Sequence, residues 1–300
     1  MPVVEVTDIF KSFGPVKAVE GVSFTVERGE IFGLLGPNGA GKTTIIRLML
    51  DIFKPDSGRI LILGGAIDEA KKERIGYMPE ERGLYQDIPL ERCLLYLASL
   101  KGVSPEAARR RAGEYLERFD LAEHRKSKVK ELSKGMQQKA QIIATLLHGP
   151  ELLIIDEPFA ALDPVNTRMV KALLRDQRAQ GVTVIMSTHQ MHQVEELCDR
   201  ILLINHGQTM LYGPIDEIRR RFSGNAVLVR SGQPLPQMAG IQNVEANNST
   251  YRLTLEPGVS AAQMLNDLVE HRVPIEYFEI ATPTLDEIFV QVVQGENQPG

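Results

Sequence analysis

The pattern of apolar and polar positions changes several times along the chain and predicts alternating strands and helices. Residues 3–9 alternate between apolar and polar positions, as a half-buried strand does. The runs at 152–155 and 182–187 are apolar without alternation, which indicates parallel strands buried on both faces. Between about 89 and 148 the apolar positions recur with helical spacing. Further strands are expected at residues 22–26, 30–35, 58–63, 74–78 and 201–204, and further helices at 42–50, 191–198 and 215–222.

The helical pattern stops near residues 223–225, Ser-Gly-Asn, and the remaining segment has a pattern of its own. Its apolar positions predict two strands and a helix, at residues 226–229, 251–255 and 261–269. The last helix is expected to begin at Thr284, because Glu287 follows at the spacing of a capping box. The expected domains therefore span residues 1–222, with a helical subdomain at about 89–148, and residues 225–300.

Composition narrows the class of protein. A chain of 300 residues with 43% hydrophobic and 24% charged residues is expected to fold into globular domains rather than stay disordered. The net charge of -5 gives no global attraction for nucleic acid, and the basic run at 124–128 is better explained as a solvated face. No apolar run reaches the roughly 18 residues of a membrane span. Cys93 and Cys198 stand alone, which favours neither a disulfide framework nor a zinc site.

The strongest chemical signal is a glycine-rich loop between a predicted strand and a predicted helix. Residues 36–43 read GPNGAGKT, the phosphate-binding pattern G-x-x-x-x-G-K-[ST]. Glycines let backbone N–H groups approach an anion closely, Lys42 adds a positive charge, and the Thr43 hydroxyl is suited to Mg²⁺. The predicted nucleotide-binding residues here are Gly36, Pro37, Asn38, Gly39, Ala40, Gly41, Lys42, Thr43 and Thr44.

Hydrolysis needs an acidic partner for the metal and a group that orients water. The run 152–157 reads LLIIDE and supplies both at the end of an apolar strand. Asp156 is predicted to hold Mg²⁺, and Glu157 to orient or deprotonate water. The alternative is two exposed acids at a strand end. The upstream phosphate loop favours catalysis.

A third motif resembles the signature segment of the ATP-binding subunits of ABC transporters. It is LSKGMQ at residues 132–137, and a generic phosphate-loop protein has no reason to carry it. The order of motifs agrees with that family over residues 1–222, including ALD at 161–163. The resemblance implies an α/β P-loop NTPase core of ABC ATPase type with an antiparallel β subdomain and a helical subdomain. It also implies ATP and Mg²⁺, a head-to-tail dimer, most simply of two identical chains, and a separate transmembrane permease.

The resemblance also assigns single residues. In the family an aromatic residue stacks on adenine, which Phe13 would do here, although the residue alone would suit a core. Ser133 and Gly135 would contact the γ-phosphate bound by the partner subunit. His189 corresponds to the switch histidine that helps position the attacking water. Asp163 corresponds to an interface aspartate, although an Asp at a helix N-terminus explains it equally well.

The chain departs from the family pattern at three positions. Glu80 stands where a glutamine is usual, and as an oxygen ligand it is expected to keep a role at Mg²⁺ while adding negative charge. In the signature, Lys134 replaces the usual glycine and Met136 the usual glutamine. Ser133 and Gly135, which supply the expected nucleotide contacts, remain.

The function expected is therefore an ATPase that energises a membrane permease at the cytoplasmic face of the membrane. A soluble ABC ATPase that acts on ribosomes or DNA is the alternative, but such proteins commonly carry two cassettes or a long coiled-coil insertion. A nucleotide kinase would leave the signature, Asp163 and His189 unexplained. Residues 225–300, with ATPTLDEIF at 281–289, resemble a small domain found on some exporter-type ATPases. This favours export, with a role for the domain in dimerisation, in regulation or only in stability.

Overall fold

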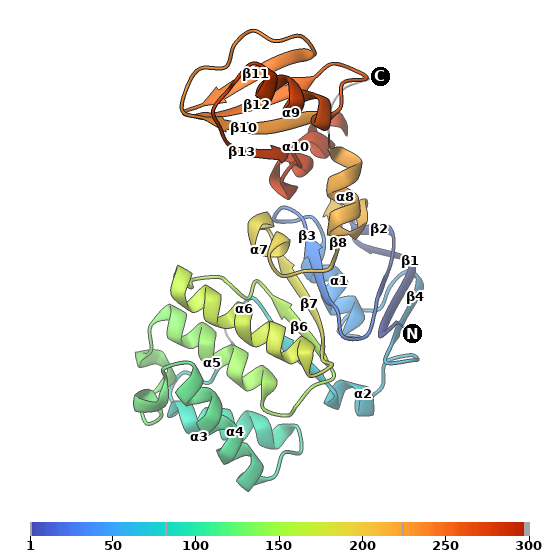
Figure 1. Cartoon of the computed structure of the whole chain (residues 1–300). Coiled ribbons are helices and arrows are strands. Elements are labelled where there is room, and N and C mark those ends of the chain that lie inside the picture. Colours follow the sequence, from blue (N-terminus) through green and yellow to red (C-terminus); the bar gives the residue numbers. More distant parts are fainter. Residues whose placement is uncertain (1, 82, 224, 297–300) are drawn as a thin grey trace. The chain divides into compact units, whose positions relative to one another are not determined.

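The computed structural model describes residues 2–81, 83–223 and 225–296 and divides the chain into two compact units (Figure 1). The first unit comprises residues 1–215 and the second residues 216–300. Within the described ranges, no helix combines the length and the apolar content that a bilayer span requires.

A six-stranded sheet forms the centre of the first unit. Its order is β5-β6-β7-β3-β8-β9, and all neighbours are parallel except β8 and β9. The strands are β3 (Ile31–Leu35), β5 (Ile75–Met78), β6 (Leu152–Asp156), β7 (Thr183–Thr188), β8 (Arg200–Asn205) and β9 (Gln208–Pro214). Every residue of β6 and β7 is buried, which confirms the prediction of parallel strands covered on both faces.

A second, antiparallel sheet has the order β2-β1-β4. Its strands are β1 (Val4–Phe13), β2 (Val16–Val26) and β4 (Ser57–Ile62). Helix α1 (Lys42–Met49) follows the glycine loop, and its Ile45 and Met49 share one hydrophobic core with Val4 and Val22 of this sheet. The core therefore joins the antiparallel sheet to the helix that begins at the phosphate loop.

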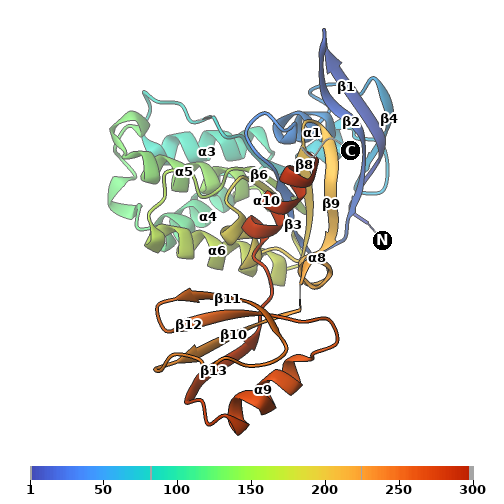
Figure 2. The ribbon, with the colours of Figure 1, turned by 90° about the horizontal axis from the view of Figure 1, so that it is seen from above.

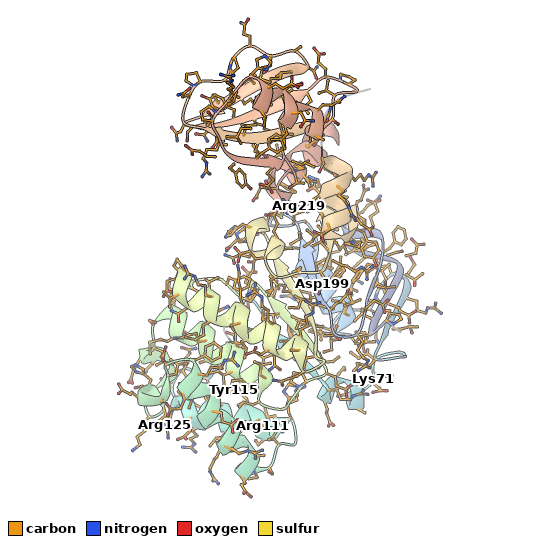
Figure 3. The ribbon with its side chains drawn as sticks, viewed as in Figure 1. Lys71, Arg111, Tyr115, Arg125, Asp199 and Arg219 are labelled. Atoms are coloured by element: carbon orange, nitrogen blue, oxygen red, sulfur yellow. The ribbon has the colours of Figure 1, made fainter. Side chains whose placement is uncertain are left out.

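Three helices form the region predicted to be helical: α3 (Leu90–Leu100), α4 (Pro105–Arg118) and α5 (Lys134–Leu146). Ser104 caps α4 by accepting a hydrogen bond from the Ala107 N–H. Arg111 donates to the Leu147 carbonyl at 2.7 Å and so ties α4 to the end of α5 (Figure 3). The remaining helices of the unit are α2 (Glu69–Glu73), α6 (Pro164–Ala179) and α7 (Met191–Glu195).

The second unit is an antiparallel sheet with helices. The order β11-β12-β10-β13 joins β10 (Ala226–Ser231), β11 (Ile241–Asn247), β12 (Thr250–Leu255) and β13 (Ile275–Ile280). Its other elements are α8 (Ile215–Phe222), which begins at the division, α9 (Ala261–Glu270) and α10 (Leu285–Glu296). Met264 and Leu268 of α9 pack on the sheet. The Thr284 and Glu287 side chains each accept the other's backbone N–H, as the capping box predicts.

Candidate active site

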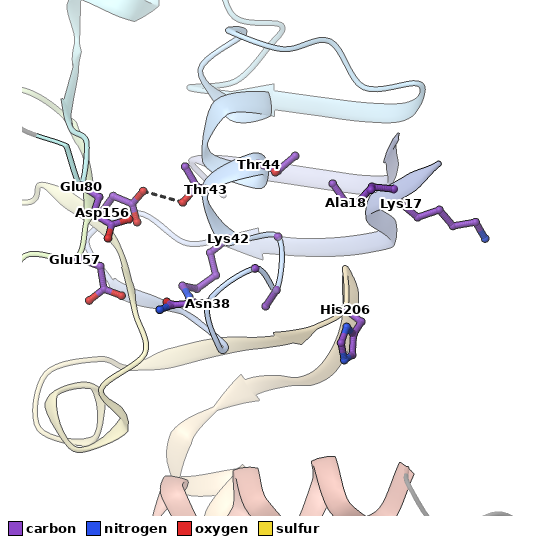
Figure 4. A pocket seen from close by; sticks show the side chains of 14 residues that line it. Lys17, Ala18, Asn38, Lys42, Thr43, Thr44, Glu80, Asp156, Glu157 and His206 are labelled. Atoms are coloured by element: carbon purple, nitrogen blue, oxygen red, sulfur yellow. Dashed lines mark hydrogen bonds between the residues drawn. The ribbon is translucent and has the colours of Figure 1, made fainter. Parts of the chain in front are cut away.

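A cavity of about 390 Å³ lies at the phosphate loop (Figure 4). This volume is in the usual range for small-molecule sites. The cavity brings the loop together with three carboxylates that the sequence places far from it. Its lining residues are Val16, Lys17, Ala18, Asn38, Gly39, Ala40, Gly41, Lys42, Thr43, Thr44, Glu80, Asp156, Glu157 and His206.

The shape of the loop depends on glycine at two positions. Gly36 has φ 150°, and a Cβ there would lie 2.2 Å from the Ile204 carbonyl oxygen. Gly41 has φ 109°, and a Cβ there would lie 2.5 Å from the Ala18 carbonyl oxygen. Side chains at either position would push the loop away from its neighbours. The glycines therefore serve the tight fit of the loop as well as access for an anion.

Lys42 is buried at the base of the cavity and folds back over the loop. Its Nζ donates to the Gly36 carbonyl at 2.7 Å and to the Pro37 carbonyl at 3.1 Å. Burial lowers the pKa of Lys42, and the three cavity carboxylates oppose this shift by favouring the charged amine. A buried ammonium group that donates to two backbone carbonyls keeps its full charge for an anionic ligand.

Thr43 and Asp156 provide oxygen atoms on facing sides of the cavity. The Thr43 hydroxyl donates to Asp156 Oδ2 at 3.1 Å, as the dashed line in Figure 4 marks. Asp156 is only 1% exposed, and its other oxygen accepts a hydrogen bond from Ser187. Glu80 lines the same cavity. Hydroxyl and carboxylate oxygens are the ligands that Mg²⁺ prefers, so these residues fit that ion.

Glu157 is held in one orientation by the loop that follows β7. Its Oε1 accepts the His189 backbone N–H at 3.1 Å and lies 2.7 Å from His189 Nδ1, and its Oε2 accepts from the Thr188 hydroxyl at 3.1 Å. The residue is 6% exposed and has φ 51°. That left-handed conformation costs about 1–3 kcal/mol for a residue other than glycine, and such strain clusters at functional sites. His189 itself is half-exposed and does not line the cavity.

The signature residues lie outside the cavity. Ser133 is exposed and caps α5, where its Oγ accepts the Met136 N–H at 3.2 Å. A Cβ at Gly135 would lie 3.2 Å from the Ala161 carbonyl oxygen, which leaves little room for a larger residue. Asp163 caps α6, where Oδ1 accepts the N–H groups of residues 165 and 166. Neither the signature residues nor Asp163 are among the residues that line the phosphate-loop cavity.

Phe13 ends β1 beside the cavity rather than within it. It pairs with Val16, which does line the cavity. Its ring meets Phe53 edge-on with centroids 5.2 Å apart, and Lys11 Nζ lies 5.5 Å from the ring centre. At 43% exposure Phe13 is not buried in a core.

Sequence reasoning missed four lining residues: Val16, Lys17, Ala18 and His206. Figure 4 shows Lys17 and His206 on the side of the loop opposite the carboxylates. His206 belongs to the tight turn between β8 and β9, where the Gly207 N–H donates to the Ala40 carbonyl at 2.9 Å. The sequence does carry one sign of the His206 position. A His-Gly pair directly after an apolar run indicates a turn at the end of a strand.

Comparison with known proteins identifies the family. Residues 19–160 match the family model described as ABC transporter. The chain is 37% identical over 288 residues to an uncharacterized ABC transporter ATP-binding protein, YhaQ, of Bacillus subtilis, with 95% of this chain and 96% of that protein covered. The chain belongs to the ABC transporter ATP-binding proteins. Members of this family are ATPases, so the expected enzyme class is confirmed.

Three further comparisons extend the match. A Rhizobium sp. protein, the Nod factor export ATP-binding protein I, is 32% identical over 302 residues, which covers 98% of this chain and 97% of that protein. A solved structure of an ATP-binding subunit of an ABC transporter has a TM-score of 0.68 at 35% identity, with 73% of this chain and 93% of that chain covered. Residues 213–293 match the C-terminal domain of DrrA1-3-like ATP-binding proteins. The fold expected from the resemblance is therefore confirmed.

Proposed function

We propose that this ABC ATP-binding protein is the motor subunit of an exporter, and that two copies close head to tail around two ATP molecules. In this proposal residues 1–222 form the nucleotide-binding domain and residues 225–300 a small domain of their own. A separate permease provides the path through the membrane, and the chain works at its cytoplasmic face. ATP-driven closing and product release then power the permease.

The proposal rests on one observation: the residues expected to contact ATP lie in two separate places on the same chain. One cavity gathers the phosphate loop, Asp156 and Glu157, whereas Ser133 caps an exposed helix end that does not line it. A helix N-terminus is a natural anion site, because its N–H groups and dipole favour negative charge. A second copy would bring this helix end to the open side of the cavity, with closed two-fold symmetry as the default.

Each group then has a task in hydrolysis. Lys42 and the backbone N–H groups of the loop bind the β- and γ-phosphates. Thr43, Asp156 and Glu80 would hold Mg²⁺, which neutralises charge on the phosphate oxygens when bound. Glu157 Oε2, which also accepts from the Thr188 hydroxyl, takes the proton of the attacking water, while Oε1 stays fixed by two His189 contacts. Phe13, which is 43% exposed, would stack on adenine.

The direction of transport is inferred from relatives. One relative is named for export, and the C-terminal segment matches that of DrrA1-3-like proteins. These names support an exporter here.

Reconstitution with the co-purifying permease tests whether the chain drives transport and whether the direction is export. The complex is placed in vesicles with this chain facing outward, and ATP is added outside. An exporter should then accumulate a transported compound inside the vesicles, whereas ATP-driven loss from preloaded vesicles would contradict the assigned direction. Sedimentation of the chain with ribosomes, in place of a membrane protein, would support the soluble alternative.

A further inference from the structure

Helix α5 connects the signature to the backbone of Glu157. Ser133 caps the helix at its N-terminus, and Gln138 follows in its second turn. The Gln138 amide Nε2 donates to the Glu157 carbonyl at 3.1 Å and to the Pro158 carbonyl at 3.3 Å. The rise from Ser133 to Gln138 is about 7.5 Å along the helix. Because the helix is rigid over this distance, a displacement of Ser133 also displaces Gln138.

Glu157 needs support from outside its own strand. Its backbone is left-handed at φ 51°, which a glutamate adopts only when the surroundings hold it there. Its N–H donates to the Ser187 carbonyl at 3.0 Å, and its carbonyl accepts the Ala160 N–H at 3.2 Å. Gln138 adds the side-chain contact to this peptide from the helical subdomain. Glu157 is thus held between the central sheet and α5.

The same helix also holds the backbone beside Glu80. Gln141 is 4% exposed, and its Nε2 donates to the Pro79 carbonyl at 2.8 Å and to the Glu81 carbonyl at 3.1 Å. Gln138 and Gln141 are three positions apart and so share one side of the helix. One face of α5 therefore contacts the chain at two of the three carboxylates that line the cavity.

We propose that Gln138 is a positioning residue that couples the signature of one ATP site to the base of the other. The inference rests on the proposed dimer. There, Ser133 meets the nucleotide bound by the partner subunit, while Gln138 on the same helix fixes Glu157 at the nucleotide of its own subunit. Engagement of one site thus sets the geometry of the base in the second. Small displacements of a catalytic group have large effects on rate, even when the cause is distant.

Steady-state hydrolysis by the full chain with its permease tests the coupling. In Gln138→Met the side chain keeps its length but loses the donor, so kcat should fall about tenfold with the half-saturating ATP concentration within about twofold. The Hill coefficient for ATP should fall from above about 1.5 toward 1, because the sites no longer communicate. Gln138→Glu should lower kcat further, because it sets carboxylate oxygens against two carbonyl oxygens.

The Glu157→Gln background separates positioning from general damage. Glu157→Gln removes the base that Gln138 is proposed to position. Adding Gln138→Met to this variant should therefore change its residual turnover by less than about twofold. A further tenfold loss in that background would overturn the proposal, since it would show a general structural effect. An unchanged kcat or an unchanged Hill coefficient in Gln138→Met would also overturn it.

Failure of this inference can be told apart from failure of the proposed function. If the proposed function is wrong, the wild-type chain itself will lack ATP-driven dimerisation or Glu157→Gln will keep its turnover. If only the coupling is wrong, wild type and Glu157→Gln behave as expected and Gln138→Met matches wild type. Equilibrium ATP binding and thermal unfolding of each variant establish that it is folded.

Discussion

The phosphate-loop cavity and the signature end of α5 differ in how complete they are. In the cavity, Asp156 and Glu157 are nearly buried and already hydrogen-bonded to residues of other segments of the chain. At the signature, Ser133 and Lys134 are exposed, and the Ser133 hydroxyl serves its own helix. The first region is organised within one chain, whereas the second is an exposed helix N-terminus. Changes in the cavity should therefore affect chemistry and ATP binding, and changes at the signature should affect assembly.

The largest expected effect is that of Glu157→Gln. The amide keeps the size of the side chain and can still accept from His189, but it cannot take a proton from water. We expect kcat to fall by about a thousandfold, with the ATP dissociation constant within about threefold. Phosphate release and equilibrium nucleotide binding measure the two quantities. Glu106→Gln makes the same change at an exposed position of α4 and should leave both unchanged, while normal turnover in Glu157→Gln would remove the assigned base.

Lys42→Ala should have the next largest effect and act on binding. It removes the buried positive charge of the cavity and two hydrogen bonds to the loop. Charge-assisted contacts to phosphate are worth a few kcal/mol, so ATP affinity should fall about a hundredfold. Calorimetric titration measures the affinity, and thermal unfolding without nucleotide controls for collapse of the loop. Retained affinity in a folded variant would show that the loop binds phosphate through its backbone alone.

The sequence predicted the parts of the molecule whose signals are local. The loop at 36–43, the apolar run ending at Asp156 and the capping box of Thr284 and Glu287 each depend on neighbouring residues, and the structure has them as expected. β9, β11 and β13 were not predicted. Most residues of β11 and β13 are exposed, and β9 opens with exposed Gln208, so none of the three shows the buried apolar pattern that strand prediction needs.

The rest of the site depends on contacts between distant segments. His206 and Lys17 reach the cavity through two hairpin turns, and no motif marks them. The Gln138 contact to Glu157 joins residues 19 positions apart through helix packing. A glutamine in a helix gives no sign in the sequence of which carbonyl it will meet. The catalytic residue types were therefore predictable, but the contacts that orient them were not.

Ser133→Ala should give a smaller effect that separates the two regions. Loss of the N-cap costs about 1 kcal/mol of stability, and loss of the hydroxyl removes an expected contact across the dimer. ATP-driven dimerisation and kcat should fall about tenfold, while ATP binding to the isolated chain stays the same. Ser104→Ala is a matched control, because Ser104 caps α4 in the same way. Equal loss of dimerisation in both variants, measured by analytical ultracentrifugation, would mean that only helix stability matters.

Glu80→Gln should have the smallest effect, because Glu80 lies on the exposed side of the cavity. An amide oxygen can still approach Mg²⁺, but the full negative charge is lost, so the half-saturating Mg²⁺ concentration should rise about threefold at fixed ATP. Hydrolysis measured across a Mg²⁺ titration gives this value. Glu81→Gln changes the exposed neighbouring residue and should leave the titration unchanged. If Glu80→Gln also leaves the Mg²⁺ titration unchanged, Glu80 has no role at the metal. The cavity would then hold its metal through Thr43 and the buried Asp156, and the contrast between preorganised and exposed groups would be greater.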